Sequence, residues 1–559
     1  MRFSDVLSRR IFLQRGSACV GLAVSTSLPS FLWSAPAATV EARTAFGTLR
    51  GANENGVLSF KGVPYAGPVD GNHRFRQAAP LQPWSGIRDA LKLGPPSWQP
   101  GKTYFGIDEP SPQENCLVLT IWTPAIDRKR RPVMFYSHGG GFVVGSSGAP
   151  PQDGGNLSRE YDVVVVSSNH RLGLLGYLYL GDIAGEEYRT SGNQGLLDIA
   201  DALKWVNENI ENFGGDPDNL MIFGESGGGA KTSCLYAMPA AHNFFNKASI
   251  ESGPGIRMLE KETATETARM VLRHFGFEDR EWRKLLSLPA EKLIEAQVAV
   301  SRPPGLPGSR LGWRQGISGL LGPGAFAPVV DGHMLPNHPF DPSAPAISKD
   351  KPLIVGTNRH ETTFFFWEKK NTETFELTFA TLRARLQQEF GADAETILAT
   401  YRQSRPEASP PDIYIAITTA GMFWIGALAI AERKYAQGGA PVYSYMFVHE
   451  SDYIIPGTMH KFGAGHATEI PYKFDNIGVV RNSGGMAFLG PTSTSAAAAH
   501  NMSEMWATFA RTGHPAAEGQ PSWPAYDLKD RATMEIDARC KVVNDPYGAE
   551  RELWERLKA

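Results

Sequence analysis

Ser226 is the residue of this sequence whose surroundings most clearly indicate chemistry. It stands in the run GESGG at residues 224–228, directly after the apolar run LMIF at residues 220–223. A strand that turns sharply into a helix at a G-x-S-x-G run presents the serine hydroxyl on a strained turn, the nucleophile elbow. Glycines are needed there because side chains would collide with the neighbouring strand and helix. The run predicts a serine that attacks a carbonyl carbon, although in a chain with 58 glycines it is a weak signal alone.

A glycine-rich run upstream is suited to stabilise the oxyanion that such an attack creates. Residues 138–142 (HGGGF) follow the apolar run at residues 133–137. Three consecutive glycines let backbone N–H groups converge on one oxygen atom. A plain tight turn is the alternative, but the place of this run upstream of the elbow favours an oxyanion loop. The absence of side chains beside the donors also predicts room for bulky alcohol groups.

The elements that position these residues are predicted by β-rich runs that alternate with helical segments. A non-alternating run, VVVV at residues 163–166, is typical of a central strand buried on both sides. Apolar residues recur at helical spacing over residues 196–210. This pattern predicts an α/β fold with a large, mostly parallel sheet flanked by helices. The expected strands cover residues 117–122, 133–137, 163–168, 220–223, 353–355 and 442–447.

Two stretches with weaker strand signals are predicted to be helical insertions over the active site. They run from about residue 256 to 350 and from about residue 370 to 437. No Ser/Gly/Pro linker, long charge run or internal repeat divides residues 38–559, which predicts a single domain. The net charge of −3 and the lack of long Lys/Arg blocks argue against a nucleic-acid partner. No Cys or His spacing typical of a metal site is present, and we expect no cofactor.

The first 37 residues have the features of an export signal. An Arg9-Arg10 pair within residues 8–14 (SRRIFLQ) precedes a moderately apolar stretch at residues 18–33 and small residues at 35–37. This order predicts a twin-arginine signal cleaved near Ala37, and hence a periplasmic or secreted protein. The alternatives are a disordered basic N-terminus and a membrane anchor. The apolar stretch is short and diluted by serine and glycine, which argues against a stable membrane span.

Cysteine usage excludes a disulfide scaffold. Of the four cysteines, Cys19 would leave with the signal, and Cys116, Cys234 and Cys540 remain. Because three is an odd number, at least one thiol is free in an oxidising compartment. Whether Cys116 pairs with either of the others stays open at the level of sequence.

Over nearly its whole mature length the chain resembles the type-B carboxylesterases, the cholinesterase-like family that includes para-nitrobenzyl esterases. The resemblance implies the α/β-hydrolase fold and the hydrolysis of carboxylic esters by a serine nucleophile. The matching segments include residues 60–66 (FKGVPYA), 83–86 (PWSG), 169–173 (NHRLG), 192–196 (GNQGL), 213–217 (FGGDP), 506–513 (WATFARTG) and 523–526 (WPAY).

The same resemblance implies a catalytic triad of Ser226, Glu361 and His466. Glu361 ends the string GTNRHE, and His466 stands in the string GAGHATEIPY, at the family's motif positions. The chain order of serine, acid and histidine agrees with the fold that the elbow indicates. His460 and His360 are nearby alternatives, but neither lies in the family's histidine motif. His466 would act as general base, an acyl-enzyme would form, and water would release the acid.

The resemblance also assigns the residues around the nucleophile. The N–H groups of Gly140, Gly141 and Gly227 would form the oxyanion hole. Glu225 matches a family glutamate that lines the site, and we expect an electrostatic role for it, with a solvated turn residue as the alternative. With an ordinary histidine as base, kcat/KM would rise with pH through an apparent pKa of about 6 to 7.

Three departures limit what the resemblance implies. Gly227 stands where the family usually has alanine. The family's N-terminal disulfide ends at the cysteine matched by Cys116, but the partner position holds Ser97. No tryptophan lies near the end of the loop at residues 98–115, which argues against a choline-selective pocket.

These features together predict an exported serine hydrolase that acts on a small carboxylic ester. A lipase and a specialised aromatic-ester, natural-product-ester or carbamate hydrolase are alternatives within the same mechanism. A non-catalytic adhesion module shares the fold but lacks the triad residues, which are present here. A single sequence does not position the insertions, so the preferred ester, interfacial activation and the choice between monomer and homodimer stay open.

Overall fold

The computed structural model describes residues 38–101, 109–301, 321–478, 489–490 and 492–558. The chain divides into the units Met1–Ala37 and Ala38–Ala559. The predicted export signal therefore lies outside the described residues. All that follows concerns the second unit.

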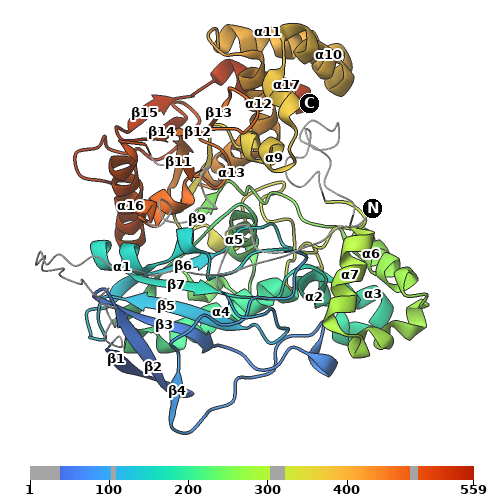
Figure 1. Ribbon diagram of the computed structural model, residues 1–559, viewed down its shortest axis with the longest axis vertical. Helices are drawn as coiled ribbons and strands as arrows, with labels where there is room; N and C mark the ends of the chain where they lie inside the picture. Colours follow the sequence, from blue (N-terminus) through green and yellow to red (C-terminus); the bar gives the residue numbers. More distant parts are fainter. Residues whose placement is uncertain (1–37, 102–108, 302–320, 479–488, 491, 559) are drawn as a thin grey trace, which may run out of the picture. The chain divides into compact units, whose positions relative to one another are not determined.

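A 13-stranded sheet runs through this unit (Figure 1). Its strands are β1 (Thr39–Thr44), β2 (Gly47–Glu54), β3 (Val57–Pro64), β4 (Ile87–Asp89), β5 (Val118–Thr123), β6 (Arg131–Ser137), β7 (Val164–Ser168), β8 (Gly215–Glu225), β9 (Lys247–Glu251), β10 (Leu353–Asn358), β11 (Val442–Phe447), β14 (Ala532–Ile536) and β15 (Lys541–Asn544). The strand order is β1-β2-β3-β5-β7-β6-β8-β9-β10-β11-β14-β15, and β4 pairs with β2. A separate two-stranded sheet joins β12 (Ser451–Ile454) to β13 (Lys461–Gly463).

The central strands are parallel, and the antiparallel pairs lie toward the two edges. Every neighbouring pair from β7 through β6, β8, β9, β10 and β11 to β14 is parallel. All six predicted strands are present, as β5, β6, β7, β8, β10 and β11. The predicted mostly parallel α/β-hydrolase sheet is therefore confirmed.

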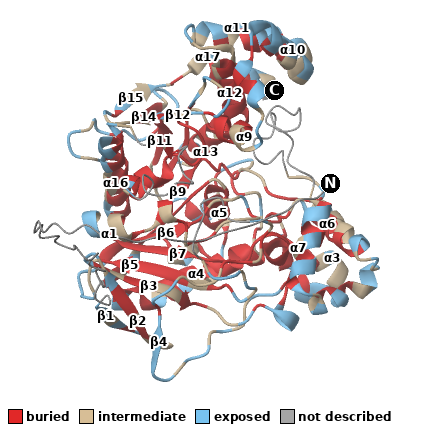
Figure 2. Ribbon diagram, in the orientation of Figure 1, coloured by how far each residue is buried: buried red, intermediate tan, exposed pale blue. Residues whose placement is uncertain are grey.

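Helices pack on both faces of the sheet and form a separate hydrophobic core with each face. Because successive side chains of a strand point to opposite faces, Val164 and Val166 belong to one core while Val163 and Val165 belong to the other. Figure 2 shows these central strands buried. The helices are α1 (Gly155–Tyr161), α2 (Gly173–Tyr177), α3 (Gly181–Ala184), α4 (Gln194–Asn209), α5 (Gly227–Ala237), α6 (Lys261–His274), α7 (Ala290–Val300), α9 (Thr362–Glu368), α10 (Phe379–Phe390), α11 (Ala394–Ser404), α12 (Pro410–Thr419), α13 (Ile425–Ala436), α14 (Ile470–Lys473), α16 (Ser495–Thr512) and α17 (Gly548–Lys558).

Both predicted insertions contain helices, and they form separate groups in Figure 1, α6 and α7 at the right and α10 and α11 at the top. A π-helical turn, Ala420–Trp424, joins α12 to α13 in one continuous helix, Pro410–Ala436. By length and mean hydropathy this helix is able to cross a membrane, but 94% of its apolar window is buried inside the protein. Its apolar character is accounted for by its place in the core.

Candidate active site

Ser226 occupies a strained turn between β8 and α5. Its backbone has a φ of 58° and a ψ of −122°, a conformation that non-glycine residues rarely adopt. The glycines on both sides have no room for a side chain. A Cβ atom at Gly224 would collide with the backbone of Gly228, and one at Gly228 would collide with the carbonyl oxygen of Ser137. The sequence GESGG therefore meets the steric demands of this turn.

Ser226 lines a cavity of about 270 Å³. The other lining residues come from the loop after β6, from Glu225, from α9 and its C-terminal end, and from the segment that begins at His466. No described residue of the predicted insertion at residues 256–350 lines this cavity. The wall that the sequence did not predict is α9, which contributes Phe364, Phe365 and Glu368, with Lys369 directly after it.

Glu361 follows β10 and holds the imidazole of His466. Its Oε2 lies 2.6 Å from His466 Nδ1. Its Oε1 accepts a hydrogen bond from the backbone N–H of Asn358 at 2.8 Å. The backbone N–H of His466 also donates to the Glu361 carbonyl at 3.2 Å. Both side chains are buried, so Nδ1 is fixed on Glu361 and Nε2 is directed to the opposite side of the ring.

His466 Nε2 meets a second carboxylate there. Glu225 Oε1 lies 3.2 Å from this nitrogen, without the alignment of a hydrogen bond. Within the described chain, no hydrogen bond joins the Ser226 hydroxyl to His466, although both residues line the same cavity. The structure therefore brings the three predicted triad residues to one site, with Glu225 beside the nitrogen that would serve Ser226.

The buried carboxylates control the protonation of His466. Burial lowers the pKa of His466, but Glu225, Glu361 and Glu469 outweigh burial and raise this pKa to about 9. Burial raises the pKa of Glu225, and the neighbouring His466 opposes that rise. Burial likewise raises the pKa of Glu361. These carboxylates favour the imidazolium form of His466.

The predicted oxyanion loop, residues 138–142, is a tight turn packed against the start of α5. Gly140 and Gly141 have φ angles of 87° and 63°. The Gly140 carbonyl accepts the N–H groups of Val143 at 3.3 Å and Val144 at 3.1 Å. A Cβ atom at Gly227 would collide with the backbone of Gly141. This close approach accounts for the glycine at a position where the resemblance leads one to expect alanine.

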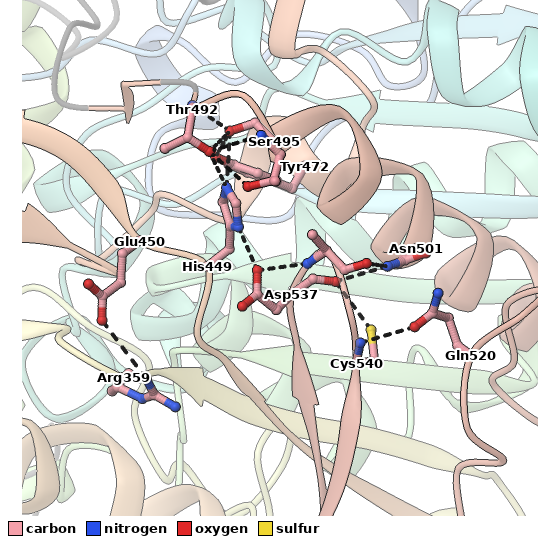
Figure 3. Close-up of polar contacts among 12 residues, drawn as sticks. Arg359, His449, Glu450, Tyr472, Thr492, Ser495, Asn501, Gln520, Asp537 and Cys540 are labelled. Carbon is pink, nitrogen blue, oxygen red and sulfur yellow. Dashed lines mark hydrogen bonds and ion pairs between the residues drawn. The ribbon is translucent and has the colours of Figure 1, made fainter.

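A second serine, histidine and carboxylate array lies outside the cavity (Figure 3). His449 Nδ1 is 2.7 Å from Asp537 Oδ1, and His449 Nε2 is 3.0 Å from Ser495 Oγ. Ser495 is fully buried, and its hydroxyl also contacts Tyr472 Oη at 3.0 Å and accepts the Thr492 N–H at 2.8 Å. Because polar partners surround this hydroxyl, the array ties the start of α16 to the ends of β11 and β14 and does not present a nucleophile.

The three described cysteines form no disulfide with one another. Cys116, Cys234 and Cys540 are buried free thiols. Ser97 hydrogen-bonds to the thiol of Cys116, and burial raises the pKa of this thiol to about 12. Across the residues that the structure describes, no group of three or more His, Cys, Asp and Glu side chains is arranged to hold a metal ion.

Comparisons with known proteins match nearly the whole of the second unit of this chain. The model of the Carboxylesterase family matches residues 37–554. The para-nitrobenzyl esterase of Bacillus subtilis (strain 168) is 35% identical over 512 residues, which cover 91% of this chain and 97% of the relative. The phenmedipham hydrolase of Pseudarthrobacter oxydans is 31% identical, with 90% and 96% covered. The crystal structure of the carboxylesterase EST55 of Geobacillus stearothermophilus at pH 6.2 has a TM-score of 0.77 and 34% identity, with 92% of this chain and 99% of that chain covered.

Proposed function

The chain belongs to the carboxylesterase family and is a carboxylic ester hydrolase, and from that premise we propose that Ser226, His466 and Glu361 are its catalytic triad. One observation carries this assignment. Ser226 on the strained turn lines the same cavity as His466, whose Nδ1 lies 2.6 Å from Oε2 of the buried Glu361. Small-molecule esters are the substrates of this family.

The proposed reaction proceeds through an acyl-enzyme. Neutral His466 takes the proton of Ser226 as Oγ attacks the ester carbonyl, and the N–H groups of Gly140, Gly141 and Gly227 stabilise the oxyanion. His466 then gives the proton to the departing alcohol. Water, activated by His466, attacks the acyl-enzyme and releases the acid. Glu361 keeps the imidazole in place and stabilises the imidazolium throughout.

Before the attack, His466 Nε2 must exchange its contact with Glu225 for one with Ser226. Catalytic hydrogen bonds are often long without substrate and tighten in the Michaelis complex. Glu225, only 3.2 Å from Nε2, then stabilises the imidazolium that forms as the serine loses its proton. We assign this electrostatic role to Glu225, in place of direct participation in proton transfer.

Aromatic side chains favour esters with an apolar, aromatic part. The rings of Phe365 and Phe423 are each centred 5.0 Å from the His466 ring, and that of Phe364 lies at 5.9 Å. Phe364 and Phe365 line the cavity, and aromatic walls bind apolar groups through area burial and ring contacts. The Bacillus relative is named for a para-nitrobenzyl group, which points the same way. We therefore propose an aromatic-ester hydrolase, and expect a higher kcat/KM for benzyl acetate than for ethyl acetate.

The triad assignment is tested by Ser226→Ala, His466→Ala and Glu361→Gln. Each change should lower kcat on para-nitrophenyl acetate by about three orders of magnitude, because the three residues act as one unit. Far-UV circular dichroism should stay unchanged. His460→Ala is the matched control and should stay within about tenfold of wild type. Full activity of the His466 variant together with loss in the His460 variant would reverse the assignment.

We further propose that residues 1–37 direct export through the twin-arginine route and that Ala38–Ala559 is the mature enzyme. The sequence features of this segment support the proposal. The first described strand, β1, begins at Thr39, so cleavage near Ala37 would leave the sheet complete.

A further inference from the structure

Lys231 is a fully buried lysine that the proposed triad does not use. It lies on α5, five residues after the nucleophile. Its ammonium donates a hydrogen bond to the His138 carbonyl at 3.0 Å, and no described carboxylate forms an ion pair with it. Burial lowers its pKa to about 7. A buried ammonium without a counter-charge lowers the free energy of unfolding. Such a destabilising residue is expected where function requires it.

The carbonyl that Lys231 holds is at the first residue of the oxyanion loop. The His138 ring turns back on its own loop, with Nδ1 at 2.9 Å from the Gly139 carbonyl oxygen. The ring also stacks on His170, with centroids 4.6 Å apart. Burial and the charge of Lys231 keep the pKa of His138 well below its usual value. The ring is therefore neutral, and because a carbonyl only accepts, its Nδ1 carries the proton and donates.

Two contacts within the loop determine where the Gly140 and Gly141 N–H groups point. In a trans peptide the C=O and N–H bonds point in opposite directions. Because the His138 ring holds the Gly139 carbonyl, the Gly140 N–H of the same peptide is directed to the other side. The Gly140 carbonyl is held in turn by Val143 and Val144, so the Gly141 N–H is fixed in the same way. All three loop glycines line the cavity that contains Ser226.

We propose that Lys231 is a positioning residue for the oxyanion hole, because its ammonium ties the helix that carries the nucleophile to the loop that carries the donors. This hydrogen bond is needed because α5 and the loop contact each other elsewhere mainly through backbone atoms. Gly227 and Gly228, which lie at that contact, have no side chains that could pack against the loop. This inference rests on the proposed serine mechanism and adds to it a residue outside the cavity wall.

The test compares Lys231→Met with wild type, with Lys231→Leu as a second apolar replacement. Thr232→Val is the matched control, since Thr232 is buried on the same helix and its hydroxyl has no partner among the described residues. The readouts are kcat per titrated active site, KM, the inhibition constant of an aryl trifluoromethyl ketone and the melting temperature. This ketone adds the serine hydroxyl to its carbonyl, which places an oxyanion in the hole.

We expect both Lys231 variants to lose at least about tenfold in kcat, with KM within about twofold, because the donors act mainly in the transition state. The ketone should bind more weakly by a similar factor. The melting temperature should stay equal or rise, since an unpaired buried charge has been replaced by an apolar group. Thr232→Val should match wild type in every readout.

Wild-type kcat and ketone affinity in a folded Lys231 variant would overturn the inference while leaving the serine mechanism intact. A lower melting temperature with unchanged kcat per titrated site would also overturn it, because Lys231 would then be purely structural. Failure of the serine mechanism would show separately, as activity of the wild-type enzyme that survives Ser226→Ala.

Discussion

We propose that Glu225 influences the pH range in which the enzyme works, because it lies beside the His466 imidazole. Its carboxylate raises the pKa of His466, together with Glu361 and Glu469 and against the effect of burial. A raised histidine pKa means that the neutral base is present only at higher pH. The acid limb of kcat/KM should therefore lie above the pH expected for an ordinary histidine.

Glu225→Gln should move this acid limb to lower pH by about one unit or more. The change removes the negative charge 3.2 Å from Nε2, so the imidazolium is less favoured and the pKa of His466 falls. The measurement is kcat/KM for para-nitrophenyl acetate across the neutral pH range. Asp452→Asn, on the exposed face of β12, serves as control. An unmoved limb in Glu225→Gln would show that this carboxylate does not control the base.

Gly141 lines the cavity beside the proposed oxyanion donors. A Cβ atom there would meet nothing within 4 Å, whereas one at Gly140 would collide with the Val144 carbonyl. We expect wild type to hydrolyse tert-butyl acetate slowly, and Gly141→Ala to lose this activity more than activity on para-nitrophenyl acetate. Gly140→Ala should lose both by distorting the loop. Equal losses of both esters in Gly141→Ala would contradict this view of the pocket.

At the scale of single residues, the sequence predicted the features that depend on the local backbone. The glycines around Ser226 and in the HGGGF run are visible because the backbone itself demands them. Glu225 was recognised as a site residue, but its position against His466 Nε2 depends on how β8 and the loop after β13 meet. Lys231 gave no signal, because only the fold shows that its ammonium is buried without a counter-charge.

Among the elements, the loop after β7 is fixed to α4 by a buried ion pair. Arg171 Nε donates to Asp198 Oδ2 at 2.8 Å and its second guanidinium nitrogen donates to Oδ1 at 2.6 Å. Asp198→Asn would leave the Arg171 guanidinium buried without its counter-charge. We expect a loss of about 3–5 kcal/mol in the free energy of unfolding, measured by urea denaturation. Asp201→Asn, on the same helix but closer to solvent, should change it by less than about 1 kcal/mol.

A change of similar size in both variants would show that the loss comes from altering α4 and not from the buried pair. Arg171 lies in the NHRLG segment of the family resemblance, so this prediction also gives a physical reason for one of the matching segments.

The sequence predicted the strands more reliably than the walls of the cavity. Buried runs such as VVVV identify β7, and the apolar spacing over 196–210 identifies α4. The strand β8 begins earlier than expected, at Gly215, because turn-forming residues before the apolar run also pair with β6. The register of this pairing shifts between Arg131 and Val133. The helix α9 was missed because its run TTFFFW has no helical alternation, and packing on both sides decides its conformation.

On the scale of the whole molecule, export should depend on the arginine pair. Arg9→Lys with Arg10→Lys, made in the native host, should leave the precursor in the cytoplasm because the twin-arginine route reads this pair. Cell fractionation and N-terminal sequencing are the measurements, and the mature protein should begin near Ala38. Unchanged export of the double variant would point to another secretion route.

In the proposed mechanism the sheet, the turn at Ser226 and the buried His466 together make one serine nucleophilic. Covalent labelling measures this directly. Diethyl para-nitrophenyl phosphate transfers its phosphoryl group to an activated serine and releases para-nitrophenol. Tandem mass spectrometry should place one diethylphosphoryl group per chain on Ser226, in parallel with the loss of activity, and His466→Ala should not be labelled. Labelling of Ser495 instead, or inactivation that leaves Ser226 unmodified, would contradict the proposed mechanism.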